Sequence, residues 1–148
     1  MKKIIALRGV GNRGKSQTIK DACDLLAKYP GATIEHLAVT RGRDIKVLVT
    51  INGTKIGIES QGDPSNRLPA SLKEFVGMGC EIIICATRSS GDTVEAVRKL
   101  GRDYEIVWLS HGENLVNSES KQKVRNQKTV KQIIAEVNKS LGSKKGQP

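Results

Sequence analysis

The residues whose types and spacing suggest chemistry stand near the start of the chain, at positions 9–16, which read GVGNRGKS. Gly9 and Gly14 carry no Cβ, so the backbone N–H groups around them can approach an anion closely. The segment lies between a short apolar run and a helical pattern, and the N-terminus of a helix attracts phosphate. Lys15 would balance phosphate charge and the Ser16 hydroxyl would bind Mg²⁺. The pattern therefore predicts a phosphate-binding loop.

The loop satisfies G-x-x-x-x-G-K-[ST] at every fixed position, and the chain thereby resembles the P-loop NTPase superfamily. The resemblance rests on Gly9, Gly14, Lys15 and Ser16 and on strands and helices that alternate over most of the chain. It implies binding of a nucleoside triphosphate with Mg²⁺ and chemistry at the γ-phosphate. The expected nucleotide-binding residues are Gly9, Gly11, Asn12, Arg13, Gly14, Lys15, Ser16 and Gln17.

The resemblance also implies an acidic residue at the end of a neighbouring apolar strand, where it would hold Mg²⁺ or its water. Glu59 ends the apolar run in IGIESQGD, and Asp63 offers the shorter carboxylate that family members more often use. A plain turn before Pro64 explains Asp63 equally well. Glu59 and Asp63 both remain candidates as metal ligands and as groups that orient water.

A second apolar run ends in ATRSSGDT, at residues 86–93. Arg88 is suited to stabilise charge on a transferring phosphate or to hold an acceptor phosphate, and a solvated surface arginine is the alternative. Asp92 is expected to be the N-cap of the helix that follows. His111, in a later loop, is a candidate for contact with base or substrate. The predicted catalytic residues are Lys15, Glu59, Asp63 and Arg88.

Composition limits the partners. Aromatic residues make up only 3% of the chain, which argues against a stacking platform for single-stranded nucleic acid. The formal net charge of +10 favours phosphate-rich partners. A row of cations near the C-terminus is suited to bind nucleic acid, although the solvated face of a helix explains it as well: Lys121, Lys123, Arg125, Lys128 and Lys131.

The cellular compartment is predicted from the spacing of the cysteines and from the lengths of the apolar stretches. Cys23, Cys80 and Cys85 lack CxxC spacing and are expected to be buried free thiols in a reducing cytoplasm. No stretch approaches the length of a membrane span, and the N-terminus lacks the pattern of a signal peptide. We expect a cytoplasmic protein without a membrane partner, and its oligomeric state stays open.

The elements that must position these residues alternate in type along the chain. Asn52-Gly53 lies between two alternating runs and predicts a two-residue hairpin. Apolar runs predict further strands, and helical spacing predicts a helix after each of the first and last strands and two between them. The strands are expected at 4–7, 33–39, 81–88 and 105–109, and helices follow the loop, lie near 72–76, span 92–100 and occupy the C-terminal region.

These patterns predict an α/β fold, a three-layer α/β/α sandwich whose mostly parallel sheet has an antiparallel hairpin at one edge. Ligands bind such sheets at the carboxyl ends of the strands. The length of 148 residues fits one domain, expected at 1–141, with a flexible basic tail at 142–148. The segments expected to share one rim of the sheet are 9–16, 59–63, 87–92 and 110–113.

The sequence thus predicts a small protein that binds ATP with Mg²⁺ through its P-loop. GTP is less favoured because the guanine signature [NT]-K-x-D is missing. Hydrolysis coupled to a partner is preferred, since no acceptor-binding insertion is evident. The alternatives are a small kinase that transfers the γ-phosphate to a nucleotide, nucleoside or polynucleotide, and a basic nucleic-acid-binding module without catalysis.

Overall fold

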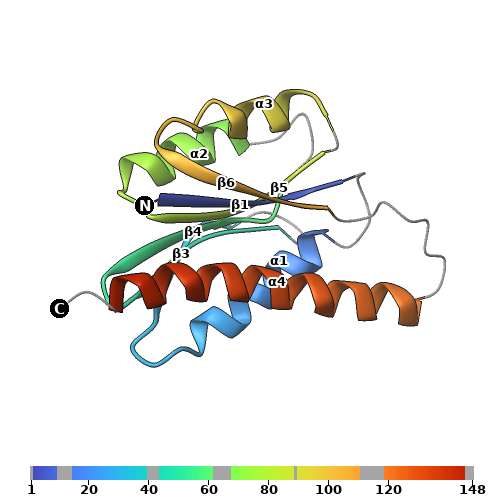
Figure 1. The fold of residues 1–148 in the computed structure, drawn as a ribbon, viewed down its shortest axis with the longest axis horizontal. Helices are drawn as coiled ribbons and strands as arrows, with labels where there is room; N and C mark the ends of the chain where they lie inside the picture. The colour runs from blue at the N-terminus through green and yellow to red at the C-terminus, as the bar shows by residue number, and fades with distance from the viewer. Residues whose placement is uncertain are drawn as a thin grey trace.

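In the computed structural model, the described residues are 2–9, 15–39, 44–61, 68–88, 90–110 and 119–145. These residues form one six-stranded sheet and four helices (Figure 1). The elements are, in chain order, β1 (Lys2–Arg8), α1 (Lys15–Ala27), β2 (Thr33–Val39), β3 (Ile45–Ile51), β4 (Thr54–Glu59), α2 (Leu68–Gly77), β5 (Ile82–Thr87), α3 (Asp92–Arg98), β6 (Tyr104–Ser110) and α4 (Glu119–Lys145).

The sheet has the strand order β2-β3-β4-β5-β1-β6. β4, β5, β1 and β6 run parallel to one another, whereas β3 is antiparallel to both of its neighbours. The predicted α/β fold with a mostly parallel sheet is thus confirmed. The hairpin of β3 and β4 does not form the edge, because β2 pairs outside it. Thr33, Ile34, Glu35 and His36 of β2 are exposed, which an edge position permits.

The predicted hairpin turn is confirmed by its backbone angles. Asn52 has a φ of 50° and Gly53 a φ of 82°. A two-residue turn between antiparallel strands requires positive φ at both positions, which asparagine tolerates and glycine adopts without strain. The turn therefore sets the register in which β3 and β4 pair along their whole length.

Helices cover both faces of the sheet (Figure 1). Ile5 and Leu7 of β1 pack in one apolar cluster with residues of α1 and α4, and Ile4 and Ala6 pack in another with residues of α2 and α3. Because neighbouring side chains of a strand point to opposite faces, residues 4–7 of β1 and residues 82–86 of β5 are apolar on both sides of the strand. This burial on both faces explains the continuous apolar run of β5, all of whose residues are buried.

The three cysteines are buried free thiols, as predicted. Burial raises the pKa of the Cys23 and Cys80 thiols to about 11. Burial also raises the pKa of Cys85 to about 12, and the negative charge of Glu59 adds to this effect. These thiols are therefore protonated at neutral pH and poor nucleophiles.

One local prediction about α3 is wrong. The N-cap of α3 is Gly91, and Asp92 is the first residue of the helix. Gly91 has a φ of 95°, a conformation that glycine adopts without strain, so the chain turns into the helix one residue earlier than predicted. Asp92 still lies in the first turn, where a negative charge suits the helix dipole.

Among the described residues, no helix has both the length and the apolar character to cross a membrane.

Candidate functional site at the carboxyl ends of the strands

The carboxyl ends of β1, β4, β5 and β6 lie at one edge of the sheet, because these strands run parallel. β1 leads into the glycine-rich segment, of which the structure describes Gly9. The Gly9 N–H donates a hydrogen bond of 3.3 Å to the carbonyl oxygen of Thr87, the last residue of β5. The start of the loop is thereby joined to the end of the neighbouring strand.

Lys15 is the first residue of α1, and it is 7% exposed. Its Nζ donates hydrogen bonds to the carbonyl oxygens of Gly9 and Thr87, at 2.8 Å in the second case. A buried charge is costly unless hydrogen bonds compensate for the lost water. These carbonyl groups therefore hold the ammonium at the strand-end edge, where it would meet an anion that binds there.

Ser16, the next residue of α1, contacts an acidic residue that the sequence pattern did not single out. Its Oγ donates a hydrogen bond of 2.9 Å to Oδ1 of Asp44, which directly precedes β3. The same Oδ1 accepts a hydrogen bond of 2.9 Å from Oγ of Ser60, which directly follows β4. Because β3 is antiparallel to β4, its start lies at the edge where β4 ends.

A signal for Asp44 was present in the sequence. The Asn52-Gly53 turn predicts antiparallel strands, so an acid placed directly before the first of them lies beside the end of the second. Glu59 marks that end, and Asp44 is therefore the acid that the hairpin brings to the same edge. Ser60, which follows Glu59, could have been found by the same reasoning.

Glu59 is fully buried and forms its hydrogen bonds with other parts of the chain. Ser71 Oγ, on α2, donates to Oε1 at 2.7 Å, and the Gln61 N–H donates to Oε2 at 3.3 Å. Glu59 was expected at the end of a strand adjacent to β1, the strand that leads into the loop. It lies elsewhere, because β5 is inserted between β4 and β1. Glu59 thus joins β4 to α2, whereas Asp44 is the carboxylate that contacts the helix after the loop.

Arg88 is half-buried directly after β5. The backbone N–H of Arg88 donates a hydrogen bond of 3.0 Å to Thr93 Oγ1, and the carbonyl oxygen of Arg88 accepts one of 2.9 Å from Thr87 Oγ1. These bonds shape the turn between β5 and α3. Arg88 thus directly follows the carboxyl end of β5, the position at which the sequence makes it a candidate.

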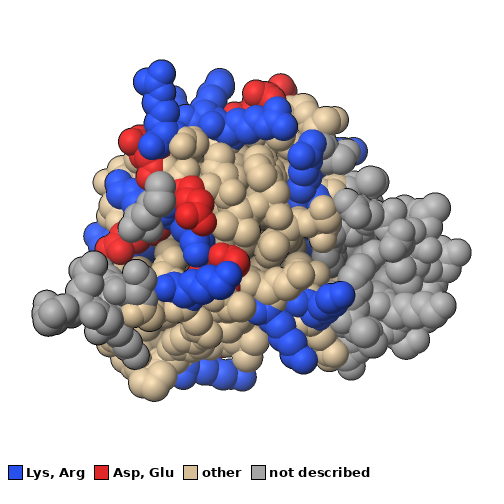
Figure 2. Space-filling view, viewed as in Figure 1, with Lys and Arg blue, Asp and Glu red and all other residues tan. Residues whose placement is uncertain are grey.

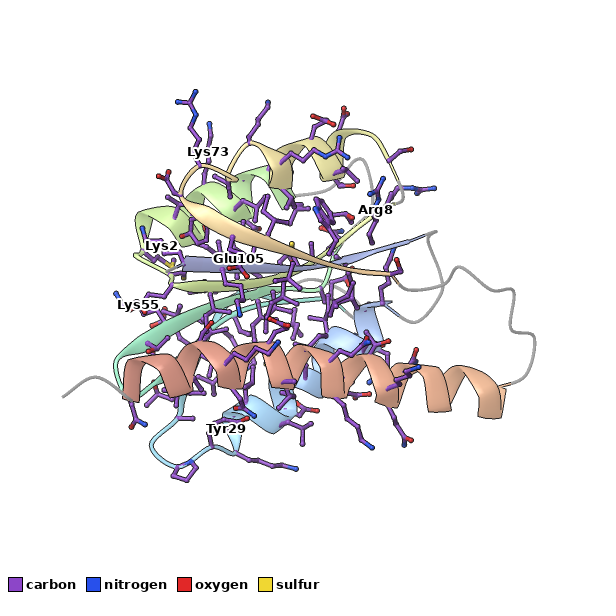
Figure 3. All side chains as sticks on the ribbon, viewed as in Figure 1. Lys2, Arg8, Tyr29, Lys55, Lys73 and Glu105 are labelled. Carbon is purple, nitrogen blue, oxygen red and sulfur yellow. The ribbon has the colours of Figure 1, made fainter. Side chains whose placement is uncertain are left out.

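A second arginine at this edge was not singled out from the sequence. Arg8 is the last residue of β1, and its guanidinium lies over the ring of Trp108 on β6, 5.5 Å from the ring centroid. Figure 3 shows Arg8 on the side of the sheet that α3 covers.

The remaining predicted residues divide into two groups. Gln17 is exposed on α1, and its Nε2 donates a hydrogen bond of 2.8 Å to Asp21 on the same helix. The others lie outside the described residues: Gly11, Asn12, Arg13, Gly14, Asp63 and His111.

The donor set of Ser16 and Asp44 fits Mg²⁺. This ion prefers oxygen ligands and, in nucleotide sites, is bound through one or two carboxylates together with substrate phosphates. The single hydroxyl hydrogen of Ser16 is directed at Asp44, so the oxygen lone pairs of Ser16 point elsewhere. Both residues are half-buried, which leaves them within reach of a ligand at the edge.

Comparison with known proteins gives no match: no family model, no curated protein and no solved structure matches the chain. The functional proposal therefore rests on the geometry of this site.

Proposed function

We propose that the protein binds a nucleoside triphosphate together with Mg²⁺ through a P-loop at residues 9–16, with ATP favoured, and acts on the γ-phosphate. The observation that carries this proposal is the position of Lys15, whose buried ammonium the carbonyl oxygens of Gly9 and Thr87 hold at the strand-end edge. A three-layer α/β/α architecture is part of the proposal, and the apolar clusters on the two faces of the sheet support it.

Lys15 would neutralise phosphate charge. A phosphate oxygen at the edge would compete with the carbonyl oxygens of Gly9 and Thr87 for Nζ, and it would form the stronger bond because both groups are charged. The N-terminus of α1 adds positive potential at the same place. Positioning and charge neutralisation are the main protein contributions to phosphoryl transfer.

Ser16 and Asp44 would hold the Mg²⁺ ion. When bound, this ion would neutralise charge that develops on the phosphate groups. We assign the metal-binding carboxylate to Asp44 in place of Glu59, because Asp44 contacts Ser16 whereas Glu59 bonds to Ser71 of α2. Arg88 keeps its proposed role in stabilising charge on the transferring group.

Hydrolysis coupled to a partner is the favoured reaction. Transfer to a phosphorylated acceptor is the second candidate, and the observation that favours it is the Arg8 guanidinium at the end of β1. Arginine recognises phosphate with two parallel hydrogen bonds, so Arg8 and Arg88 are suited to hold an acceptor phosphate. ATP labelled at the γ-phosphate separates the reactions: hydrolysis releases labelled phosphate, whereas transfer leaves the label on a second molecule.

The test of nucleotide binding is a calorimetric titration with ATP and GTP in the presence of Mg²⁺. Lys15→Ala removes a charged hydrogen-bond donor, a loss of about 1.5–3 kcal/mol, so we expect affinity to fall by about 10- to 100-fold. Lys28→Ala, an exposed lysine after the end of α1, is the matched control and should bind as the wild type does. Circular dichroism verifies that each variant is folded.

Two outcomes contradict the proposal. In one, the wild type binds neither nucleotide at any Mg²⁺ concentration. In the other, Lys15→Ala is folded and binds ATP as tightly as the wild type and Lys28→Ala do.

A further inference from the structure

Ser60 is a buried serine, 2% exposed, that bonds to the start of β3 in three ways. Its Oγ accepts a hydrogen bond of 2.8 Å from the Ile45 N–H and donates one of 2.9 Å to Asp44 Oδ1. Its own N–H donates to the Ile45 carbonyl oxygen at 3.0 Å. The Ser60 side chain is therefore fixed on both sides, and it fixes the carboxylate of Asp44 in turn.

The hydroxyl groups of Ser60 and Ser16 both bond to the same oxygen of this carboxylate. A serine hydroxyl has one hydrogen and can accept further bonds through its lone pairs. The Ser60 hydroxyl accepts a hydrogen bond from the Ile45 N–H and donates one to Asp44. The Ser16 hydroxyl also donates its hydrogen bond to Asp44. Asp44 Oδ1 thus accepts two hydroxyl hydrogen bonds, one from α1 and one from the residue that follows β4.

Glu59, which directly precedes Ser60, also takes part in a hydrogen bond between a serine hydroxyl and a carboxylate, but this bond connects it to α2. Glu59 accepts a hydrogen bond of 2.7 Å from Ser71 Oγ on α2, whereas Ser60 donates to Asp44 and so reaches Ser16 on α1. α1 and α2 lie on opposite faces of the sheet (Figure 1). The end of β4 is thus connected to one helix on each face, and the contact through Ser60 and Asp44 leads to Ser16, at the end of the glycine-rich segment.

We propose that Ser60 is a positioning residue for the metal site, which holds the Asp44 carboxylate against Ser16 and thereby sets the affinity for Mg²⁺. This inference rests on the proposed function, since it requires Mg²⁺ to bind with the nucleotide. Ser60 acts through Asp44 and touches neither phosphate nor metal. Removing a group that orients a metal ligand weakens metal binding by about 10- to 100-fold.

The experiment measures binding of a fluorescent ATP analogue at increasing Mg²⁺ concentrations and, separately, in EDTA. Ser60→Ala is expected to raise the half-saturating Mg²⁺ concentration by about 10-fold or more, while the affinity in EDTA stays within about twofold of the wild type. Ser60→Cys keeps the side-chain size but only a weak donor, so it should show a shift in the same direction even if Ser60→Ala fails to fold.

Ser71→Ala is the matched control. It removes a buried serine hydroxyl that donates to a carboxylate, as Ser60→Ala does, but the carboxylate is Glu59. We expect Ser71→Ala to lower stability and to leave the half-saturating Mg²⁺ concentration unchanged. Equal shifts in the Ser60 and Ser71 variants would reduce the role of Ser60 to general support of the fold and overturn the proposal.

A double-mutant cycle tests whether Ser60 acts through Asp44. If it does, adding Ser60→Ala to Asp44→Asn gives no further rise in the half-saturating Mg²⁺ concentration, whereas independent effects would add. Additive effects, or Ser60 variants that titrate like the wild type, overturn this inference alone. A wild type that binds no nucleotide overturns the proposed function as well, so the two failures are distinguishable.

Discussion

Four residues form two pairs at the open end of the β3–β4 hairpin, where β3 begins and β4 ends. Asp44 and Ser60 bond to each other, and Asp44 also accepts a hydrogen bond from Ser16 of α1. Lys46 and Glu59 lie opposite each other in the antiparallel register, and both are bonded to α2. The first pair thus connects to α1 and the second to α2, and Ser60, Lys46 and Glu59 are all nearly inaccessible to water.

Glu59→Gln separates the roles of the two carboxylates. The variant keeps the side-chain size but loses the charge, so its hydrogen bond with Ser71 weakens and Lys46 loses a neighbouring negative charge. We expect the free energy of unfolding in urea to fall by about 1–3 kcal/mol. The half-saturating Mg²⁺ concentration should stay that of the wild type. A rise as large as that of Asp44→Asn would return the metal role to Glu59.

Among the elements, local patterns predict which segments form strands and helices but not how the strands are ordered. The apolar run of β5 and the Asn52-Gly53 turn could be recognised because burial on both faces and positive φ each select residue types directly. Apolar residues do not specify which buried strand lies beside which. The insertion of β5 between β4 and β1 therefore could not be predicted, and Glu59 was expected beside the loop strand.

The same reason explains why the contact of Ser16 with Asp44 was missed. These residues are 28 positions apart, and they meet only because β3 begins at the edge where the parallel strands end. Lys15 and Ser16 themselves could be found from the sequence because their spacing within one loop is local. Residues from a distant hairpin required the strand directions as well.

The docking of α4 on the sheet depends in part on an ion pair with β1. Lys3 Nζ lies 3.0 Å from Glu136 Oε2, and the side chains are 10% and 19% exposed. The hydrogen bond from Lys3 is the main cause that holds the pKa of Glu136 below its ordinary value of 4.5, with Lys139 adding to it. Because the folded-state pKa is lowered, this stabilisation is present above pH 4.5 and is lost as the pH falls through the folded-state pKa.

Glu136→Gln should therefore lower the free energy of unfolding at neutral pH by about 1–3 kcal/mol. The difference from the wild type should shrink when urea unfolding is measured at a pH below the ordinary carboxyl range. Glu95→Gln breaks an exposed pair with Arg98 on α3 and is the control, with an expected change of about 0.5 kcal/mol or less. A difference between Glu136→Gln and the wild type that persists in acid would contradict the assigned ion pair.

For the whole molecule, the net charge of +10 is a property separate from the proposed nucleotide site. Lys and Arg side chains are spread over the face shown in Figure 2. Long-range attraction of polyanions depends on such summed charge, whereas Lys15 is buried and held by carbonyl groups. Binding of nucleic acid and binding of nucleotide should therefore respond to different substitutions.

We expect the protein to bind a short labelled DNA duplex at low salt, measured by fluorescence anisotropy, with an affinity that falls linearly in log–log form as salt rises. Lys15→Ala should leave this binding unchanged. Lys128→Glu with Lys131→Glu, on the exposed side of α4, should lower the affinity and reduce the slope by about 2, since each lost phosphate contact contributes about 0.9. Lys73→Glu with Lys99→Glu changes the net charge equally but lies on α2 and after α3, and its effect should be smaller. Equal losses in the two double variants would show that net charge alone drives binding, and a loss in Lys15→Ala would place the DNA phosphates in the loop itself.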